Sequence, residues 1–472
     1  MKRPLMVLAV ALALVAGACG ASGDDGASGD DDAGTTTTAV TASDAAVFGE
    51  MDAPVCGEGD FSVDPDQAGG SPDVLRIGVA GDRSSDIRPG LNKDMWDSST
   101  AFAAWCNEQG GIGGLPIEIV DLDAALFNVE AAMTTACSGV FAMVGGGLVQ
   151  DQLEFSGNDG SDFHKCGLID IPGFANSPEK SDSNGQVQPI PNPGTTQNTT
   201  WFRDFQQLYP EDAEKWAVVW GDIPSIESVK IKYESSMKDV DGYEVLDSIS
   251  YPAAGADDWV PYAQKLIDSG ATSFTWIGEP VFFTKFLETL RQRGWEGRAL
   301  LETNNYNQAL LDSPEATEGT VVRTTFHPLE EADDWPATAD YLDIVNSNVD
   351  DASVGPLGMQ SFSAWLLFAT AANACGEDND GVLDRTCILE QAAAVDDWTG
   401  GGLHGPQNPD AVDKVEASPC GMLLIVKDGE FVRLFPEVGG EGDDGDGFHC
   451  PANGVTTTTG TEAGVVDPDR PI

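Results

Sequence analysis

The feature that most constrains this chain is a regular alternation of short apolar segments and amphipathic helical segments. Residues 215–221 (KWAVVWG) and 273–278 (SFTWIG) have the composition of buried strands, and each ends in glycine. Between them, Ile226, Val229 and Tyr233 keep the spacing of a helical face. Strands that alternate with helices predict a parallel sheet with right-handed crossover connections, so an α/β fold is expected.

The alternation extends over most of residues 73–450. A hairpin is predicted at 422–436 (MLLIVKDGEFVRLFP), because Asp428-Gly429 is a strong turn signal between two apolar runs. The predicted strands before it are residues 75–81, 116–123, 141–147, 167–173, 215–221, 243–251 and 273–278.

Residues 1–18 have the composition of a signal peptide. Lys2 and Arg3 precede an apolar run that falls short of the roughly 20 residues needed to cross a bilayer. The run ends in Ala-Gly-Ala before Cys19, which resembles the bacterial lipobox and implies a lipid on the Cys19 thiol. Ordinary secretion is the alternative. Residues 19–72, acidic and rich in glycine and serine at their start, are expected to be a flexible tether.

The charge of the chain excludes one class of partner. The 472 residues include 78 acidic and 24 basic residues, a formal net charge of −54. Nucleic-acid binding is not expected, because such a chain cannot neutralise phosphates. A chain of this length is too long for one core and favours two lobes.

Nine cysteines are present, and lipidation of Cys19 would leave eight. An even number in an exported protein predicts disulfides, whereas the absence of CxxC or Cys/His clusters argues against a zinc site. No metal or other cofactor is expected. Eight cysteines allow about 105 pairing schemes, so the scheme stays open. An acidic turn between them suggests the pair Cys375–Cys387, and two consecutive predicted helix ends suggest Cys106–Cys137. The remaining cysteines would then form Cys420–Cys450 and Cys56–Cys166.

No catalytic constellation is found, so enzyme activity is not expected. The histidines lie outside any HExxH pattern, and neither GxSxG nor a phosphate-binding loop occurs. Two acidic turns, 377–381 (EDNDG) and 442–447 (GDDGDG), resemble calcium loops but lack the glutamate at position twelve. Solvated surface turns are the better interpretation.

The order of elements resembles the type 1 periplasmic binding proteins, and more narrowly the branched-chain amino acid (Leu/Ile/Val) substrate-binding proteins of ABC transporters. The resemblance implies a two-lobed α/β fold of type I, in which each lobe is a mostly parallel sheet flanked by helices, with three hinge crossings. Segments that carry it are IGVAGD (77–82), WCNEQGGIGGLPIEIVDLD (105–123), residues 257–297, GGLHGPQNP (401–409) and LLIVKDGEFV (423–432).

The resemblance also implies how the chain is divided. Ligand would bind beyond the carboxyl ends of the strands, in a cleft that closes by hinge motion. The expected first lobe is 73–196 with 324–399. The expected second lobe is 197–323 with 400–450, which includes the closing hairpin. Residues 451–472 are expected to be a disordered tail, because threonine and glycine dominate their start.

Candidate ligand-binding residues follow from strand ends and from the resemblance. In the family, a loop with a serine binds the ligand carboxylate, but this chain has Leu148 and no hydroxyl group there. The family's Tyr-Gly pair is replaced by Ser225-Ile226. An acid for a ligand ammonium group is expected near Glu302, with Glu279 as the second candidate, because a buried ammonium needs an acidic partner. The candidates are Gly146, Gly147, Leu148, Phe174, Ala175, Asn176, Ser225, Glu279, Glu302, Thr303 and Asn304.

These features lead us to expect a monomeric, extracytoplasmic solute-binding lipoprotein of an ABC importer, held at the cell membrane by its lipid alone. It would capture a small polar solute, such as an amino acid or an amide-like compound, and deliver it to the permease. Short peptides, urea-like solutes and aromatic compounds remain open as ligands. The alternatives are a sensing receptor domain of the same fold that signals through a membrane partner, and a surface lipoprotein with an inactive cleft.

Overall fold

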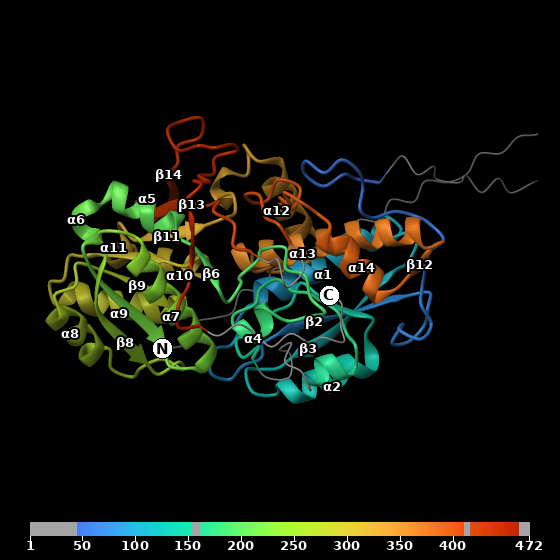
Figure 1. Cartoon of the computed structure of the whole chain (residues 1–472), viewed down its shortest axis with the longest axis horizontal. Helices are drawn as coiled ribbons and strands as arrows, with labels where there is room; N and C mark the ends of the chain where they lie inside the picture. The colour runs from blue at the N-terminus through green and yellow to red at the C-terminus, as the bar shows by residue number, and fades with distance from the viewer. Residues whose placement is uncertain (1–44, 153–160, 410–415, 462–472) are drawn as a thin grey trace, which may run out of the picture. The chain divides into compact units, whose positions relative to one another are not determined.

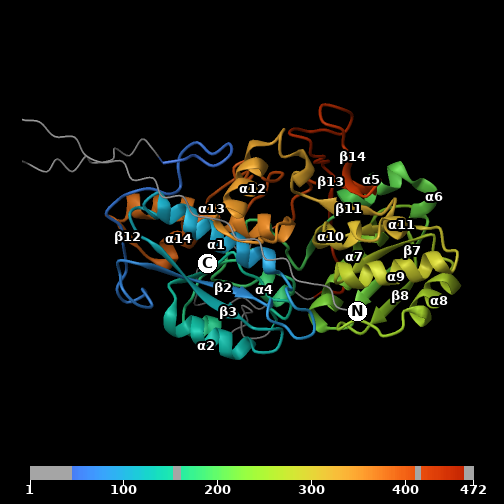
Figure 2. The same cartoon turned by 180° about the vertical axis from the view of Figure 1, so that it is seen from behind.

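The computed structural model describes residues 45–152, 161–409 and 416–461. The expected signal peptide and Cys19 lie outside the described residues, as do residues 462–472. Within the described part of the chain, no helix has the length and apolar character needed to span a membrane. The fold is α/β, with two main sheets that lie in separate halves of the described unit and two further sheets of two strands each (Figures 1 and 2).

The smaller sheet is parallel and has the strand order β3-β2-β4-β5. Helix α13 packs on α1 in the core of this half, where the rings of Phe102 and Trp365 stack with centroids 5.2 Å apart. The strands are β2 (Leu75–Gly81), β3 (Ile117–Asp123), β4 (Ala142–Val144) and β5 (Asp170–Ile171). The helices are α1 (Lys93–Glu108), α2 (Val129–Gly139), α3 (Asp162–Lys165), α4 (Pro178–Ser181), α12 (Pro336–Asn348), α13 (Pro356–Asp378) and α14 (Arg385–Ala393), with the 3-10 helix η2 at Leu329–Glu331.

The larger sheet has the order β14-β13-β11-β10-β9-β7-β8, and only β13 and β14 run antiparallel to their neighbours. Its strands are β7 (Lys215–Gly221), β8 (Glu244–Tyr251), β9 (Ser273–Ile277), β10 (Arg298–Leu301), β11 (Val321–Thr324), β13 (Met422–Lys427) and β14 (Glu430–Phe435). Its helices are α5 (Thr200–Leu208), α6 (Pro210–Ala213), α7 (Pro224–Asp239), α8 (Val260–Ser269), α9 (Pro280–Gln292), α10 (Gln308–Leu311) and α11 (Pro314–Thr317), with the 3-10 helix η1 at Thr303–Asn305.

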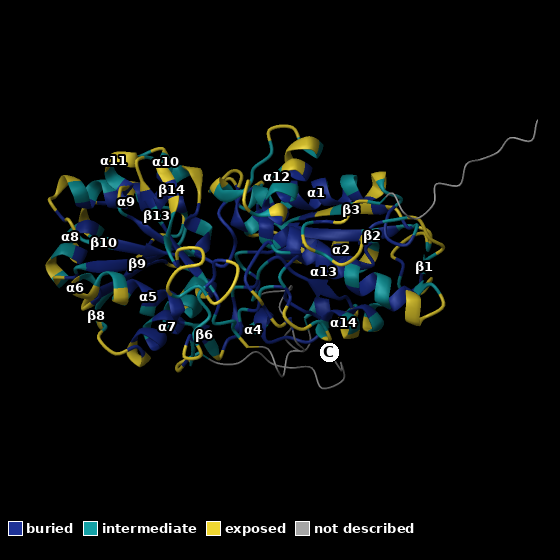
Figure 3. Ribbon diagram, turned by 90° about the horizontal axis from the view of Figure 1, so that it is seen from above, coloured by how far each residue is buried: buried dark blue, intermediate teal, exposed yellow. Residues whose placement is uncertain are grey.

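The predicted fold class is confirmed. Every strand predicted from an apolar run is present, although β4 and β5 are shorter than expected. The hairpin turn is confirmed as well, since Asp428 and Gly429 both have positive φ, of 54° and 83°. Two left-handed residues in succession match the twist of a two-residue hairpin. Figure 3 shows β9, β10 and α13 as largely buried elements, consistent with their continuous apolar runs.

Residues 45–72 differ from the expected flexible tether. Phe48 is 1% exposed and its ring lies 5.0 Å from that of Phe362 on α13. The short strand β1 (Ser62–Val63) pairs in parallel with β12 (Val382–Leu383). Because this segment contains apolar residues that bury in the first core, the expectation of a tether reaching residue 72 is wrong. Residues 19–44 lie outside the described residues.

Residues 451–461 also differ from the expected disordered tail. Strand β15 (Val455–Thr457) pairs antiparallel with β6 (Thr196–Asn198), and Thr458 Oγ1 donates to Gly194 O at 2.9 Å. Low complexity suggested disorder, but threonine is a good strand former and its hydroxyl supplies an additional donor. The segment therefore belongs to the folded unit.

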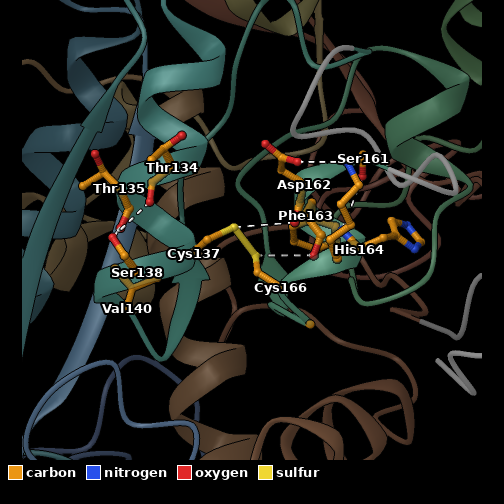
Figure 4. Close-up of a disulfide and its surroundings, with 12 residues drawn as sticks. Thr134, Thr135, Cys137, Ser138, Val140, Ser161, Asp162, Phe163, His164 and Cys166 are labelled. Atoms are coloured by element: carbon orange, nitrogen blue, oxygen red, sulfur yellow. Dashed lines mark hydrogen bonds and ion pairs between the residues drawn. A yellow bond between two sulfur atoms is a disulfide. The ribbon is translucent and has the colours of Figure 1, made fainter.

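Two of the four expected disulfides are confirmed and two are wrong. Cys375–Cys387 and Cys420–Cys450 are present, whereas Cys106 pairs with Cys56 and Cys137 with Cys166. Cys56 reaches α1 because residues 45–72 fold onto the core. Cys137 lies in α2 and Cys166 directly follows α3, so the disulfide between them joins the two helices (Figure 4). The prediction of a Cys106–Cys137 disulfide failed because cysteines at the ends of two consecutive helices need not be close in the folded structure.

Candidate functional site

A cavity of about 240 Å³ lies at the carboxyl ends of strands from both sheets. From the smaller sheet, the loop after β5 contributes Phe174, Ala175 and Asn176. From the larger sheet, the ends of β9 and β10 contribute Glu279 and Glu302, among others. This is where ligands bind in open parallel sheets, and its position matches the sequence-based expectation.

The predicted site residues divide into two groups. Four of them do not line the cavity: Gly146, Gly147, Leu148 and Ser225. The other seven do line it: Phe174, Ala175, Asn176, Glu279, Glu302, Thr303 and Asn304. Ligand binding by any of them stays a prediction.

The four predicted residues that do not line the cavity make packing contacts or hydrogen bonds within the protein. A Cβ atom on Gly146 would approach Ala80 N to 2.4 Å, and one on Gly147 would approach the Phe174 ring to 2.7 Å. Leu148 is 3% exposed and belongs to a hydrophobic core. Ser225 Oγ donates to the Val149 carbonyl oxygen at 2.7 Å. Close packing therefore requires glycine at positions 146 and 147, and the Gly147 N–H already donates to the Ala80 carbonyl oxygen at 3.1 Å.

Asp151 fixes the loop that presents Asn176. Its carboxylate accepts the Asn176 N–H at 2.6 Å and the Ser177 N–H at 3.0 Å. The Asp151 side chain is buried, and desolvation raises its pKa to about 6, against the opposing effect of these donors. The loop conformation therefore depends on one buried carboxylate.

The opposite wall contains an ion pair between adjacent strand ends. Glu302, after β10, binds Arg323 of β11 through Oε2 and Nη2. Thr303 Oγ1 donates to the Arg323 carbonyl oxygen at 3.1 Å. Glu302 Oε1 and Arg323 Nε are buried and have no hydrogen-bond partner among the described residues. Each is therefore a polar atom whose hydrogen-bonding capacity is unused within the described part of the chain.

Lys232 of α7 is a cavity residue that the sequence analysis missed. Its side chain is buried, and its Nζ donates to Asn192 Oδ1 at 2.8 Å and to the Pro193 carbonyl oxygen at 2.6 Å. The pKa of Lys232 is lowered to about 8, chiefly by burial and also by nearby Arg323, while Asp182 and Glu302 act in the opposite direction. The only available signal was a lysine beside the apolar stripe of its helix.

One ion pair joins the two sides of the cavity. Arg88, in the loop after β2, donates through Nε to Glu279 Oε2 at 3.2 Å. Burial raises the pKa of Glu279, and the Arg88 charge opposes that shift. Glu279 is therefore already paired, which weakens its case as the acid that would hold a ligand ammonium group.

Comparison with known proteins identifies the family. The sequence profile of the periplasmic binding proteins matches residues 74–415. The chain belongs to the periplasmic binding protein family. The family resemblance inferred from the order of elements is thereby confirmed. No curated protein sequence matches this binding protein significantly.

Solved structures show the same fold at low sequence identity. A leucine binding protein, LivK, from Thermotoga maritima is 15% identical, with a TM-score of 0.59 over 76% of this chain and 98% of that one. A solute binding protein from Rhodopseudomonas palustris in complex with 4-hydroxybenzoate is 16% identical, with a TM-score of 0.62 over 77% and 96%. A fatty acid ABC transporter substrate-binding protein from Thermomonospora curvata is 15% identical, with a TM-score of 0.62 over 79% and 95%.

The remaining polar wall of this periplasmic binding protein consists largely of amides. Asn192 Nδ2 donates to the Ala175 carbonyl oxygen at 2.7 Å, and Asn304 Nδ2 donates to the Gly278 carbonyl oxygen at 3.1 Å. Asn304 was predicted from the sequence but most of the other amides were not, because polar residues on irregular segments carry no periodic signal. The missed amides on the wall are Asn92, Asn192, Gln197, Asn198, Gln360 and Gln407.

Proposed function

We propose that this protein is an extracytoplasmic solute-binding lipoprotein of an ABC importer. It captures a small polar solute, an amino acid or an amide-like compound, and delivers it to the permease without making or breaking a bond. The observation that carries the proposal is the cavity, with walls from both sheets and polar groups that converge on it. Membership of the periplasmic binding protein family supports the same role.

Two lobes that close on the solute are part of this proposal. The first lobe comprises residues 73–196 and 324–399, and the second comprises 197–323 and 400–450. Three passages of the chain join them, and hinge motion about such passages opens and closes the cavity. A lipid on Cys19 holds the monomer at the membrane, close to the permease.

Thermal unfolding of the purified full chain tests solute capture. The panel contains amino acids, their amides, short peptides, small aromatic acids and fatty acids. A ligand at 100 times its dissociation constant adds about 2.7 kcal/mol to the free energy of unfolding, so the midpoint should rise by a few degrees. Cooperative unfolding with no shift for any compound class would contradict solute capture.

Uptake by intact cells then tests transport. Deletion of the gene should abolish uptake of the solute identified by the thermal panel, and the gene for the unaltered chain should restore it. A solute that binds the protein but enters deletion cells at the normal rate would favour the sensing receptor instead.

A further inference from the structure

The charges on the cavity wall differ from those of the chain as a whole. The sequence has 78 acidic and 24 basic residues, yet the charged residues that line the cavity are two acids and two bases. Glu279 is paired with Arg88 and Glu302 with Arg323. Lys232 is in none of the ion pairs found among the described residues. It is therefore the cation on this wall that lacks an anion.

The surroundings of Lys232 leave part of its ammonium group unsatisfied. An ammonium has three N–H donors, and the contacts of Lys232 are two neutral oxygens, on Asn192 and Pro193. The residue is 3% exposed and lines the cavity, so its ammonium group faces the enclosed space rather than bulk solvent. A buried charge without an ion partner is costly unless a bound group neutralises it.

Arg323 places a second cationic donor in the same region. Its Nη2 binds Glu302, but its Nε is buried and has no hydrogen-bond partner in the described part of the chain. The Asp182 and Glu302 charges raise the pKa of Lys232 and the Arg323 charge lowers it, so all three groups are within electrostatic reach of Lys232. An acceptor between Lys232 and Arg323 and a donor toward Glu302 Oε1 would satisfy all the open positions.

The side of the cavity expected to bind a carboxylate does not offer such a place. Gly146 and Gly147 pack against Ala80 and the Phe174 ring, and neither lines the cavity. Among the residues that the structure describes, the basic ones on the wall belong to α7 and β11 of the larger sheet. Apolar residues of α7 and β9, namely Ile226, Val229, Tyr233 and Ile277, also line it. They offer contact area for the uncharged part of a ligand.

We propose that Lys232, with Arg323 beside it, binds the carboxylate of the solute, so that the solute is a small organic acid with a hydrogen-bond donor for Glu302. The inference rests on the proposed function and narrows it, because neutral amides, urea-like solutes and uncharged aromatic compounds are excluded as preferred ligands. The carboxylate binds to the larger-sheet side of the cavity, not to the glycine loop.

Matched acids and amides test the preference on the unaltered full chain. The probes are leucine and leucinamide, 4-hydroxybenzoate and 4-hydroxybenzamide, and octanoate and octanamide, with affinities measured by calorimetry. At least one acid should bind, and its amide should bind at least about tenfold more weakly, a difference of 1.4 kcal/mol. An amide that binds as tightly as its acid would overturn the inference while leaving solute capture intact. Binding of none of the six at millimolar concentration, together with a shift in the thermal panel for a compound without a carboxylate, would overturn the inference alone, and a flat thermal panel would overturn both.

Substitution on α7 tests the residue. Lys232→Met should reduce affinity for the acid at least about tenfold and leave affinity for the amide little changed, whereas Lys232→Arg should retain most of the acid affinity. Lys230→Met is the matched control, because Lys230 lies near Glu227 and the Trp220 ring and does not line the cavity. Unchanged acid affinity in Lys232→Met would overturn the inference.

The pH profile gives a readout that needs no variant. Asp182, Glu302 and Arg323 are the charged groups that act on Lys232, whose pKa is about 8. Affinity for the acid should therefore fall by up to about tenfold per pH unit above pH 8, as the ammonium deprotonates, while affinity for the amide stays level. If Lys232→Met fails to fold, this profile and the comparison of acid with amide decide the matter. A level profile for the acid would contradict the role of Lys232.

Discussion

Asp151 connects the protonation of one buried carboxyl group to the shape of the cavity wall. Its two oxygens accept the N–H groups of Asn176 and Ser177 and hold the loop after β5. Burial raises its pKa from 3.8 to about 6. An acid whose pKa is higher in the folded than in the unfolded state costs stability when ionised, so this cost is present above pH 6 and declines as the pH falls toward 4.

We expect Asp151→Asn to remove this pH dependence. The free energy of unfolding of the unaltered chain, relative to the variant, should increase by up to about 2 kcal/mol between pH 7.5 and pH 4.5. Denaturant unfolding at a series of pH values measures the difference. Asp239→Asn, at an exposed position on α7, serves as the reference for substituting an aspartate. If the difference in free energy of unfolding between the unaltered chain and Asp151→Asn does not vary with pH, the raised pKa of Asp151 would be contradicted.

The sequence allowed some cavity residues to be predicted and not others. Asn176, Glu279 and Glu302 follow apolar strands, and strand ends meet at one edge of a parallel sheet, so their position followed from the sequence pattern. Lys232 lies on a helix, where a lysine ordinarily faces solvent. Its burial depends on Asn192, from a segment without periodicity, so it emerges only from the tertiary structure.

At the scale of elements, apolar strands were predictable and polar strands were not. The strands β7, β8 and β9 have continuous or alternating apolar residues that report burial directly. Strands β6 and β15 are three residues each, rich in threonine and amides. Strands β6 and β15 form because they pair with each other. Pairing between segments so far apart in the sequence leaves no local pattern from which either strand could be predicted.

Strand β15 should stabilise the segment that passes between the two sheets. Besides its pairing with β6, the residues after it hold Gly194, whose carbonyl oxygen accepts from Thr458 Oγ1 and Thr461 Oγ1 at 2.9 and 2.7 Å. Ending the chain at residue 452 removes these bonds. We expect a loss of about 3 kcal/mol in the free energy of unfolding, measured by denaturant titration, since each bond contributes about 1 kcal/mol.

The control for this truncation is a chain that ends at residue 461 and retains β15. Its free energy of unfolding should stay within about 0.5 kcal/mol of the unaltered value. Hydrogen exchange at the β6 amides should accelerate in the shorter chain alone, because they lose their partner strand. Equal stability of the two truncated chains would show that β15 contributes nothing.

At the scale of the whole described unit, contacts within the protein join the two sides of the cavity, and they include the hydrogen bonds of Lys232 to Asn192 and Pro193. Arg88 binds Glu279, and Ser225 Oγ donates to the Val149 carbonyl oxygen. Both join the smaller-sheet side to the larger-sheet side. The sequence predicted a cleft through strand order and family resemblance, but it did not indicate which charges would meet across it. Arg88 follows β2 and Glu279 follows β9, and only the packing of the two halves brings them together.

These contacts should favour the closed arrangement, and Arg88 is the place to test this because it does not line the cavity. Arg88→Gln should weaken solute affinity by up to about fivefold, since a partly exposed ion pair contributes at most about 1 kcal/mol and apparent affinity scales with the closed fraction. Small-angle scattering of the ligand-free variant should give a larger radius of gyration. Arg76→Gln, which removes the Arg76–Glu118 pair within the smaller sheet, should change neither quantity. Equal effects of the two substitutions would mean that the pair across the cavity does not control closure.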